Sequence, residues 1–239
     1  MKPFYIGLAV IAAAGVMFVL WQASAGGGGN AATEPVPVAV DPAELSSVQG
    51  ISIGREDAPV VIYEFADFQC PGCGQFAAFT APVIKERLVD TGMARYVYYD
   101  FPLLEIHQHA FLASRAGRCA NEQDRFWDYH DVLYARQATW AAMRSATDFF
   151  VELAGEIGLD EGAFESCLNS DRYQEEVSRS LQLGESLGVR GTPTLFVNMK
   201  RLDGVPDYSE LEQMGRAEMG GAAAVPAGAA ATGDSVAAQ

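Results

Sequence analysis

Residues 60–73, with the sequence VVIYEFADFQCPGC, place a Cys-Pro-Gly-Cys motif directly after a predicted strand. Residues 60–66 are mostly β-branched, aromatic or apolar, which is typical of a strand buried on both faces of a parallel sheet. Pro71 favours the first turn of a helix, so Cys70 is expected at the helix N-terminus. Free N–H groups and the helix dipole stabilise a thiolate there, and Cys73, one turn further on, can form a disulfide with Cys70. This placement predicts a redox-active pair.

Two other uses of the motif stay open at this point. One is half of a zinc site, which would need two further ligands, for which His107 and His109 are candidates. Both histidines lie at a predicted strand-to-helix junction, where we expect exposure to solvent. The other use is a purely structural disulfide bridge.

The sequence on either side of the motif predicts an α/β domain that carries an all-α segment. A strand, a helix kinked at Pro82 and a second strand form a βαβ unit. A helical block then separates this unit from two further strands and a last helix, which indicates an α/β domain with a helical insertion. The predicted elements are a helix over 71–90, a strand over 95–101, three or four helices over 106–187, strands over 194–198 and 200–202, and a helix over 207–219.

The two ends of the chain are not expected to join the core. Residues 1–22 contain an uncharged apolar run long enough to span a bilayer as a helix, which predicts a single-pass signal anchor. The alternative is a cleaved signal peptide, since the small residues 23–25 resemble a cleavage site. A glycine- and proline-rich flexible linker is expected over 23–47 and a disordered tail over 219–239, which leaves residues 48–218 as the folded domain.

Composition excludes several classes of protein. The chain has 239 residues, of which 49% are hydrophobic and 20% charged, so wholesale disorder is excluded. Acidic side chains outnumber basic ones by 31 to 16, giving a net charge of −15. A nucleic-acid binder would need a basic surface, so we expect no nucleic-acid partner.

Three segments together resemble the DsbA-like thiol–disulfide oxidoreductases. Residues 64–73 are similar to the active-site segment of that family, residues 118–130 to its helical insertion, and residues 189–194 to its cis-proline loop. The resemblance extends over roughly residues 50 to 215. It implies a thioredoxin-like fold with an inserted all-α subdomain over about residues 105–188.

The resemblance also implies roles for individual residues. Cys70 would attack and carry the mixed disulfide, and Cys73 would resolve it. Thr192 and Pro193 would form a cis peptide bond beside the active site, where the backbone of Thr192 can pair with an extended substrate. Glu64 would accept a proton from Cys73; a buried carboxylate there should have a raised pKa. The alternative for Glu64 is a solvent-facing position at a strand edge.

The active-site dipeptide, Pro71-Gly72, departs from the strongly oxidising form of the family, which has histidine in the second position. One hydrogen-bond donor to the Cys70 thiolate is therefore absent, and the sequence leaves the reduction potential open.

Cys119 and Cys167, which lie 48 residues apart in the predicted helical insertion, are expected to form a structural disulfide. An exported chain meets oxidising conditions, where leftover cysteines tend to pair. Closing this loop would contribute about 4 kcal/mol on the chain-entropy model. Two separate buried thiols are the alternative. The nearby aromatic stretch is expected to be packing, and His130 within it a hydrogen-bonded structural histidine.

These features predict a membrane-tethered oxidoreductase whose catalytic domain lies on the extracytoplasmic, periplasmic side. Its substrates would be unfolded or extended exported proteins with thiols, and a membrane redox partner would reoxidise it. No metal or organic cofactor is expected, because the thiols carry the electrons. A reductase or isomerase that serves cytochrome or copper-site assembly, and a non-catalytic peptide-binding or chaperone module, are the alternatives.

Overall fold

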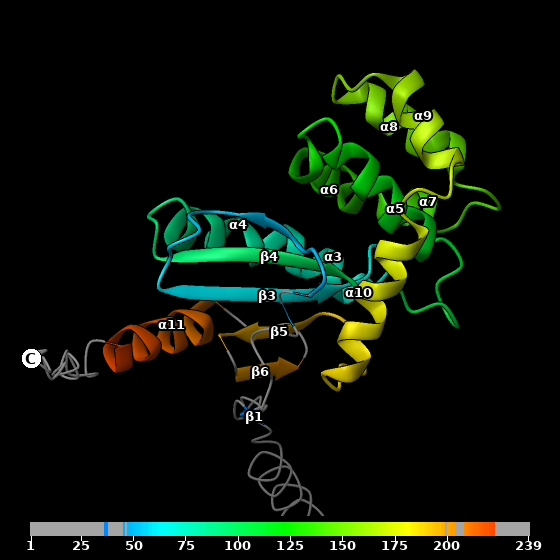
Figure 1. Cartoon of the computed structure of the whole chain (residues 1–239). Helices are drawn as coiled ribbons and strands as arrows, with labels where there is room; N and C mark the ends of the chain where they lie inside the picture. The colour runs from blue at the N-terminus through cyan, green and yellow to red at the C-terminus, as the bar shows by residue number, and fades with distance from the viewer. Residues whose placement is uncertain (1–35, 38–44, 46, 199, 204–207, 223–239) are drawn as a thin grey trace, which may run out of the picture. The chain divides into compact units, whose positions relative to one another are not determined.

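The computed structural model describes residues 36–37, 45, 47–198, 200–203 and 208–222, all of which belong to the part of the chain that begins at Pro35 (Figure 1). The predicted signal anchor over 1–22 and most of the predicted tail lie outside the described residues. Within the described part, no helix combines the length and the apolar character that crossing a membrane requires.

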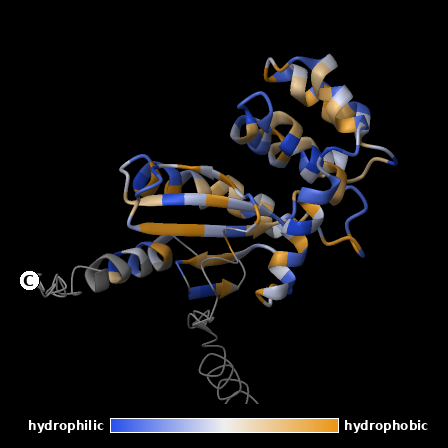
Figure 2. Cartoon of the chain, in the orientation of Figure 1, coloured by the Kyte–Doolittle hydropathy of each residue, from blue (hydrophilic) through white to orange (hydrophobic). Residues whose placement is uncertain are grey.

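A six-stranded mixed sheet forms the centre of the domain, with the strand order β1-β6-β5-β3-β4-β2. Among the described strands, only β3 and β4 run parallel, and they are joined by the helical crossover that the sequence predicts; the other described neighbours are antiparallel. Figure 2 shows the apolar character of β3 and β5, which occupy the middle of the sheet. The strands are β1 (Val36–Pro37), β2 (Ile51–Ile53), β3 (Val60–Ala66), β4 (Ala94–Asp100), β5 (Thr194–Val197) and β6 (Lys200–Asp203).

Helices cover both faces of this sheet, because side chains along β3 point alternately to either side. Val60 and Ile62 pack with the helices that follow the active-site motif and with Leu211 of α11. Phe65 points to the opposite face, where it packs with Leu183 of α10. The covering elements are α3 (Pro71–Phe79), α4 (Ala81–Ile84), the π-helix η1 (Lys85–Val89), α10 (Gln174–Ser186) and α11 (Tyr208–Ala222).

The helical insertion lies between β4 and α10 in the chain and has its own apolar core. This core extends to Phe68 and Cys73, so the insertion packs directly on the active-site segment. Its helices are α5 (Ala110–Asn121), α6 (Phe126–Ala135), α7 (Gln137–Trp140), α8 (Thr147–Glu156) and α9 (Glu161–Asn169). The fold is therefore thioredoxin-like with an inserted helical subdomain. The predicted insertion over about residues 105–188 is too long, because α10 packs on the sheet through Leu183 instead of joining the insertion.

Several boundaries differ from those predicted. The expected single helix over 71–90 is broken at Thr80 into α3, α4 and η1, since Pro82 lacks the N–H that would continue the helical hydrogen bonds. The linker predicted over 23–47 contains β1, which pairs with β6, and Leu45, which is buried in the core. Helix α11 runs to Ala222, past the predicted start of the tail. Strand β2 was not predicted from its three residues, because its identity depends on pairing with β4.

Candidate active site

The Cys-Pro-Gly-Cys motif forms the junction between β3 and α3. Cys70 is the N-cap residue of α3 with extended backbone angles, and Pro71 occupies the first helical turn. Both motif cysteines are free thiols: Cys70 is partly exposed, and Cys73 is completely buried. A second thiol can therefore reach Cys70 from solvent but cannot reach Cys73.

The two thiols differ strongly in acidity. A hydrogen bond from the Cys73 thiol, helped by Thr192 and by the backbone N–H groups of Cys73 and Gly72, lowers the pKa of Cys70 to about 5, although burial opposes this change. Burial, with a further contribution from the hydrogen bond to Cys70, raises the pKa of Cys73 well above its ordinary value. At neutral pH the thiolate is thus on Cys70, the sulfur that solvent reaches.

The loop before β5 packs against the active-site helix. Thr192-Pro193 is a cis peptide bond, and the Thr192 carbonyl oxygen lies 3.3 Å from Sγ of Cys70, which donates a hydrogen bond to it when the thiol is protonated. A Cβ added at Gly72 would lie 3.4 Å from Cδ of Pro193, so the loop covers this side of the helix closely. The structure thus brings together the two segments that the sequence places more than 100 residues apart.

Glu64 lies on β3 and is 2% exposed. The Tyr96 hydroxyl on the neighbouring strand β4 donates a hydrogen bond to its carboxylate. Burial raises the pKa of Glu64 to about 7; the hydrogen bond from Tyr96 opposes the rise, and negative charge on Cys70 adds to it. Charge on Glu64 in turn raises the pKa of Cys73, so the carboxyl and this thiol are electrostatically coupled. The solvent-facing alternative for Glu64 is wrong.

Asp67 organises the loop before the motif, and sequence analysis did not identify it. The carboxylate is fully buried and accepts hydrogen bonds from the backbone N–H of Gln69 at 2.7 Å and of Leu103 at 2.8 Å. Nδ1 of His107 lies 2.7 Å from the same carboxylate, and the Asp67 N–H donates to the Cys73 sulfur at 3.5 Å. Asp67 therefore links the buried thiol to the loop after β4. In the sequence, the feature that could have indicated this role of Asp67 is its position as a short acidic residue between a buried strand and the motif.

The expectation that both histidines are exposed is also wrong. The His107 side chain is largely buried, at 15% exposure, against Asp67, and His109 is buried, with Nε2 lying 2.8 Å from the Met143 carbonyl oxygen. The His109 N–H donates to the side chain of Gln69 at 2.8 Å. Within the described residues, no three His, Cys, Asp or Glu side chains converge as metal ligands would.

Gln137 of α7 is a second contact that sequence analysis missed. Its side-chain amide donates hydrogen bonds to the carbonyl oxygens of Phe68 at 2.7 Å and of Cys70 at 2.9 Å. These bonds hold the active-site loop against the helical insertion. Because Gln137 and Cys70 are 67 residues apart, no local pattern indicates the contact.

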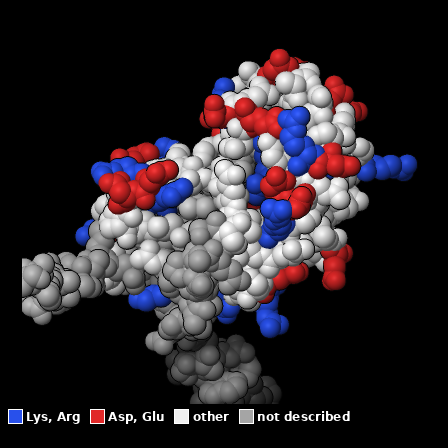
Figure 3. Space-filling view, in the orientation of Figure 1, with Lys and Arg blue, Asp and Glu red and all other residues white. Residues whose placement is uncertain are grey.

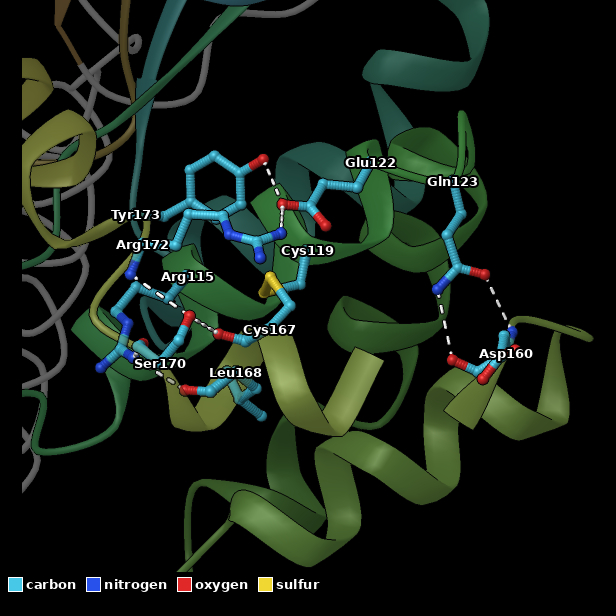
Figure 4. The surroundings of a disulfide bond; sticks show 10 residues. All are labelled: Arg115, Cys119, Glu122, Gln123, Asp160, Cys167, Leu168, Ser170, Arg172 and Tyr173. Atoms are coloured by element: carbon cyan, nitrogen blue, oxygen red, sulfur yellow. Dashed lines mark hydrogen bonds and ion pairs between the residues drawn. A yellow bond between two sulfur atoms is a disulfide. The ribbon is translucent and has the colours of Figure 1, made fainter. Parts of the chain in front are cut away.

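Cys119 of α5 and Cys167 of α9 form a disulfide inside the helical insertion (Figure 4). Both cysteines are buried. Beside them, Arg115 donates hydrogen bonds to the carbonyl oxygens of Leu168, at 2.7 Å, and of Ser170. The disulfide and these bonds tie the end of α9 to α5.

His130, in the aromatic cluster of α6, is buried and hydrogen-bonded.

Comparisons with known proteins agree with this geometry. A family model described as thioredoxin matches residues 46–214. The chain is 36% identical to the Na(+)/H(+) antiporter NhaA 3 of Salinispora tropica over 63% of its own length, but it spans only 22% of that relative. It is 29% identical to the probable disulfide bond formation protein D of Bacillus cereus, covering 68% of this chain and 75% of that protein. The crystal structure of oxidised BdbD from Bacillus subtilis superposes with a TM-score of 0.65 at 24% identity, covering 72% of this chain and 93% of that one. The chain therefore belongs to the thioredoxin family, and within it the chain is similar to disulfide bond formation proteins.

Proposed function

We propose that the chain exchanges its Cys70–Cys73 disulfide with thiols of exported proteins and so oxidises them. The observation that carries this proposal is the asymmetry of the pair: Cys70 is partly exposed with a pKa lowered to about 5, whereas Cys73 is buried with a raised pKa. An exposed low-pKa thiol beside a buried partner suits attack at one sulfur and departure of the other.

The exchange would proceed in two steps. A substrate thiolate attacks Sγ of Cys70 in the oxidised pair, the Cys70–Cys73 bond breaks, and Cys73 leaves as a thiolate that takes up a proton. In this proposal Glu64 holds and returns the proton; its electrostatic coupling to Cys73 and its pKa of about 7 support that role. A second substrate thiolate then displaces Cys70, so two electrons move from the substrate to the pair.

The lowered pKa of Cys70 supports the oxidising direction. Stabilising the thiolate stabilises the reduced enzyme, and a stable reduced form makes the disulfide a stronger oxidant. Cys70 lacks a side-chain donor from the second dipeptide position, which is Gly72, yet its thiolate accepts a hydrogen bond from the Cys73 thiol and is also favoured by the backbone N–H groups of Cys73 and Gly72.

The exposed apolar side chains on the loop after β4 favour binding of unfolded proteins. Leu104 and Ile106 are 53% and 71% exposed on the loop after β4, and Asp67 holds this loop against the active-site segment. Large apolar side chains that are exposed on a loop bonded to the active-site segment can bind apolar stretches that a folded substrate would bury.

We also place the domain outside the cytoplasm, tethered by the apolar residues 1–22, with a membrane redox partner that reoxidises it. The support is the apolar sequence of that segment and the Cys119–Cys167 disulfide, because such bonds persist in oxidising compartments. Fractionation of cells before and after carbonate washing, with residues 1–22 present or deleted, tests the tether.

The reduction potential of the full chain tests the main proposal. Equilibration with glutathione should give a value nearer to about −120 mV, which is typical of strong oxidants, than to about −270 mV, which is typical of reductants. Oxidation of a reduced, unfolded protein should require Cys70, so Cys70→Ser should abolish it. A potential near the lower value would support the reductase alternative, and undiminished function in Cys70→Ser would support the chaperone alternative.

A further inference from the structure

A basic pocket adjoins the loop that faces Cys70. It has a volume of about 300 Å³ and is lined by Gly188, residues 190–194 and Arg201, which include two guanidinium groups and no carboxylate. A Cβ added at Gly191 would meet no atom within 4 Å, so the pocket is open beside this residue. This local charge contrasts with the net charge of −15 on the whole chain.

The two arginines reach the pocket from different elements. Arg190 is exposed in the connection between α10 and β5, and no carboxylate of the described residues forms an ion pair with it. Arg201 is on β6, where its Nη1 donates a hydrogen bond to the Gly188 carbonyl oxygen at 3.3 Å. This bond holds the Arg201 guanidinium at the edge of the pocket. On the face of the helical insertion that Figure 3 shows, acidic and basic side chains are interspersed.

The pocket is within reach of a substrate bonded to Cys70. The carbonyl oxygen of Thr192, a lining residue, lies 3.3 Å from Sγ of Cys70. An extended peptide advances about 3.3 Å per residue, and its alternate side chains point to the same face. Arg190 lines the same pocket and lies two residues before Thr192 in the chain, so a side chain about two positions from the substrate cysteine is the one expected to face it.

We propose that this pocket is a specificity subsite for an Asp or Glu side chain of the substrate, about two residues from the cysteine that attacks Cys70. The inference rests on the proposed function. The planar guanidinium of Arg190 can donate paired hydrogen bonds to a carboxylate. Because Arg190 is exposed, the gain is modest: about twofold to fivefold in kcat/KM over a neutral side chain.

The test compares dithiol peptides that differ in one residue. The oxidised full-length chain is mixed with peptides carrying Glu, Gln or Lys two positions before or after the first cysteine, at low ionic strength. Glu peptides should react fastest and Lys peptides slowest, and 1 M salt should reduce the preference because screening then acts within about 3 Å. Arg190→Ser should bring the Glu to Gln ratio close to one, and Arg190→Glu should reverse the order of Glu and Lys.

Arg179→Ser is the matched control, because Arg179 is an exposed arginine on α10 outside the pocket. This variant should keep the full Glu preference. Equal rates for the three peptides with the unaltered chain, or an equal loss for all of them in Arg190→Ser, would overturn the subsite. Oxidation of dithiothreitol by the unaltered chain reports the exchange reaction itself. Oxidation of one equivalent of dithiothreitol by the Cys70–Cys73 disulfide without any peptide preference would reject the subsite alone, and no oxidation of dithiothreitol would reject the proposed function with it.

Discussion

Replacing Glu64 with glutamine should change how the stability of the protein depends on pH. Glu64 is buried beneath the active-site helix and accepts a hydrogen bond from the Tyr96 hydroxyl. The amide oxygen of glutamine can accept the same bond, so the packing is largely preserved. What the substitution removes is a group that titrates at different pH values in the folded and unfolded states.

The size of the effect follows from the two pKa values. Glu64 loses its proton near pH 4.5 in the unfolded chain and at about pH 7 in the folded protein. As the pH rises above 4.5, the unfolded state releases a proton that the folded state still holds, so the free energy of unfolding falls until the pH passes 7. At about 1.4 kcal/mol per pH unit, the total loss is on the order of 3 kcal/mol. Glu64→Gln has no such loss.

Urea unfolding of the reduced protein at pH 4.5, 6, 7 and 8 measures this difference. The buried amide N–H groups carry a cost of about 1–3 kcal/mol, but that cost is the same at every pH. The free energy of unfolding of Glu64→Gln, relative to that of the unaltered chain, should therefore rise by about 3 kcal/mol between pH 4.5 and 8. Glu165→Gln, which removes an exposed carboxylate from α9, is the control and should show little change.

A variant that differs from the unaltered chain by the same amount at pH 4.5 and pH 8 would refute the reasoning. Turnover gives an independent measurement. If Glu64 exchanges a proton with Cys73, the rate profile of the unaltered chain should have a limb near pH 7 that Glu64→Gln lacks. An unchanged profile would remove Glu64 from the proton transfer while leaving its effect on stability intact.

Three further predictions concern the cysteines and Gln137. Iodoacetamide should modify Cys70 of the reduced protein with a midpoint near pH 5, well before Cys73, and prior labelling of Cys73 would reverse the assigned roles. Replacing Cys119 and Cys167 with alanine should lower the free energy of unfolding by up to about 4 kcal/mol, measured by urea titration, while oxidation of dithiothreitol continues. A loss of turnover at unchanged stability would instead indicate electron transfer between the two pairs. Gln137→Ala should lower the free energy of unfolding, measured by urea titration, by about 1–3 kcal/mol, because it leaves two carbonyl oxygens of the active-site loop without their donor. Gln137→Glu also removes the donor and should lower the free energy of unfolding by at least as much.

The sequence by itself determined the features that depend on neighbouring residues. The strand over 60–66 has the predicted bounds, because a run of β-branched and aromatic residues favours a buried strand wherever it occurs. Helix α3 begins at Pro71 as expected, since proline suits the first turn. The position of Cys70 at a helix N-terminus follows from these two elements. The resemblance to the DsbA-like oxidoreductases also rests on short contiguous motifs, so the sequence alone is enough to detect it.

Only the tertiary structure decided which distant groups lie against the motif. Asp67 meets His107 across 40 residues, and Gln137 meets Cys70 across 67, because strand order and helix packing bring these segments together. The acidity of Glu64 also depended on the fold, since its pKa reflects burial and the hydroxyl of Tyr96 on the next strand. Burial, register and long-range hydrogen bonds are properties of the packed chain, so spacing along the sequence carries no record of them.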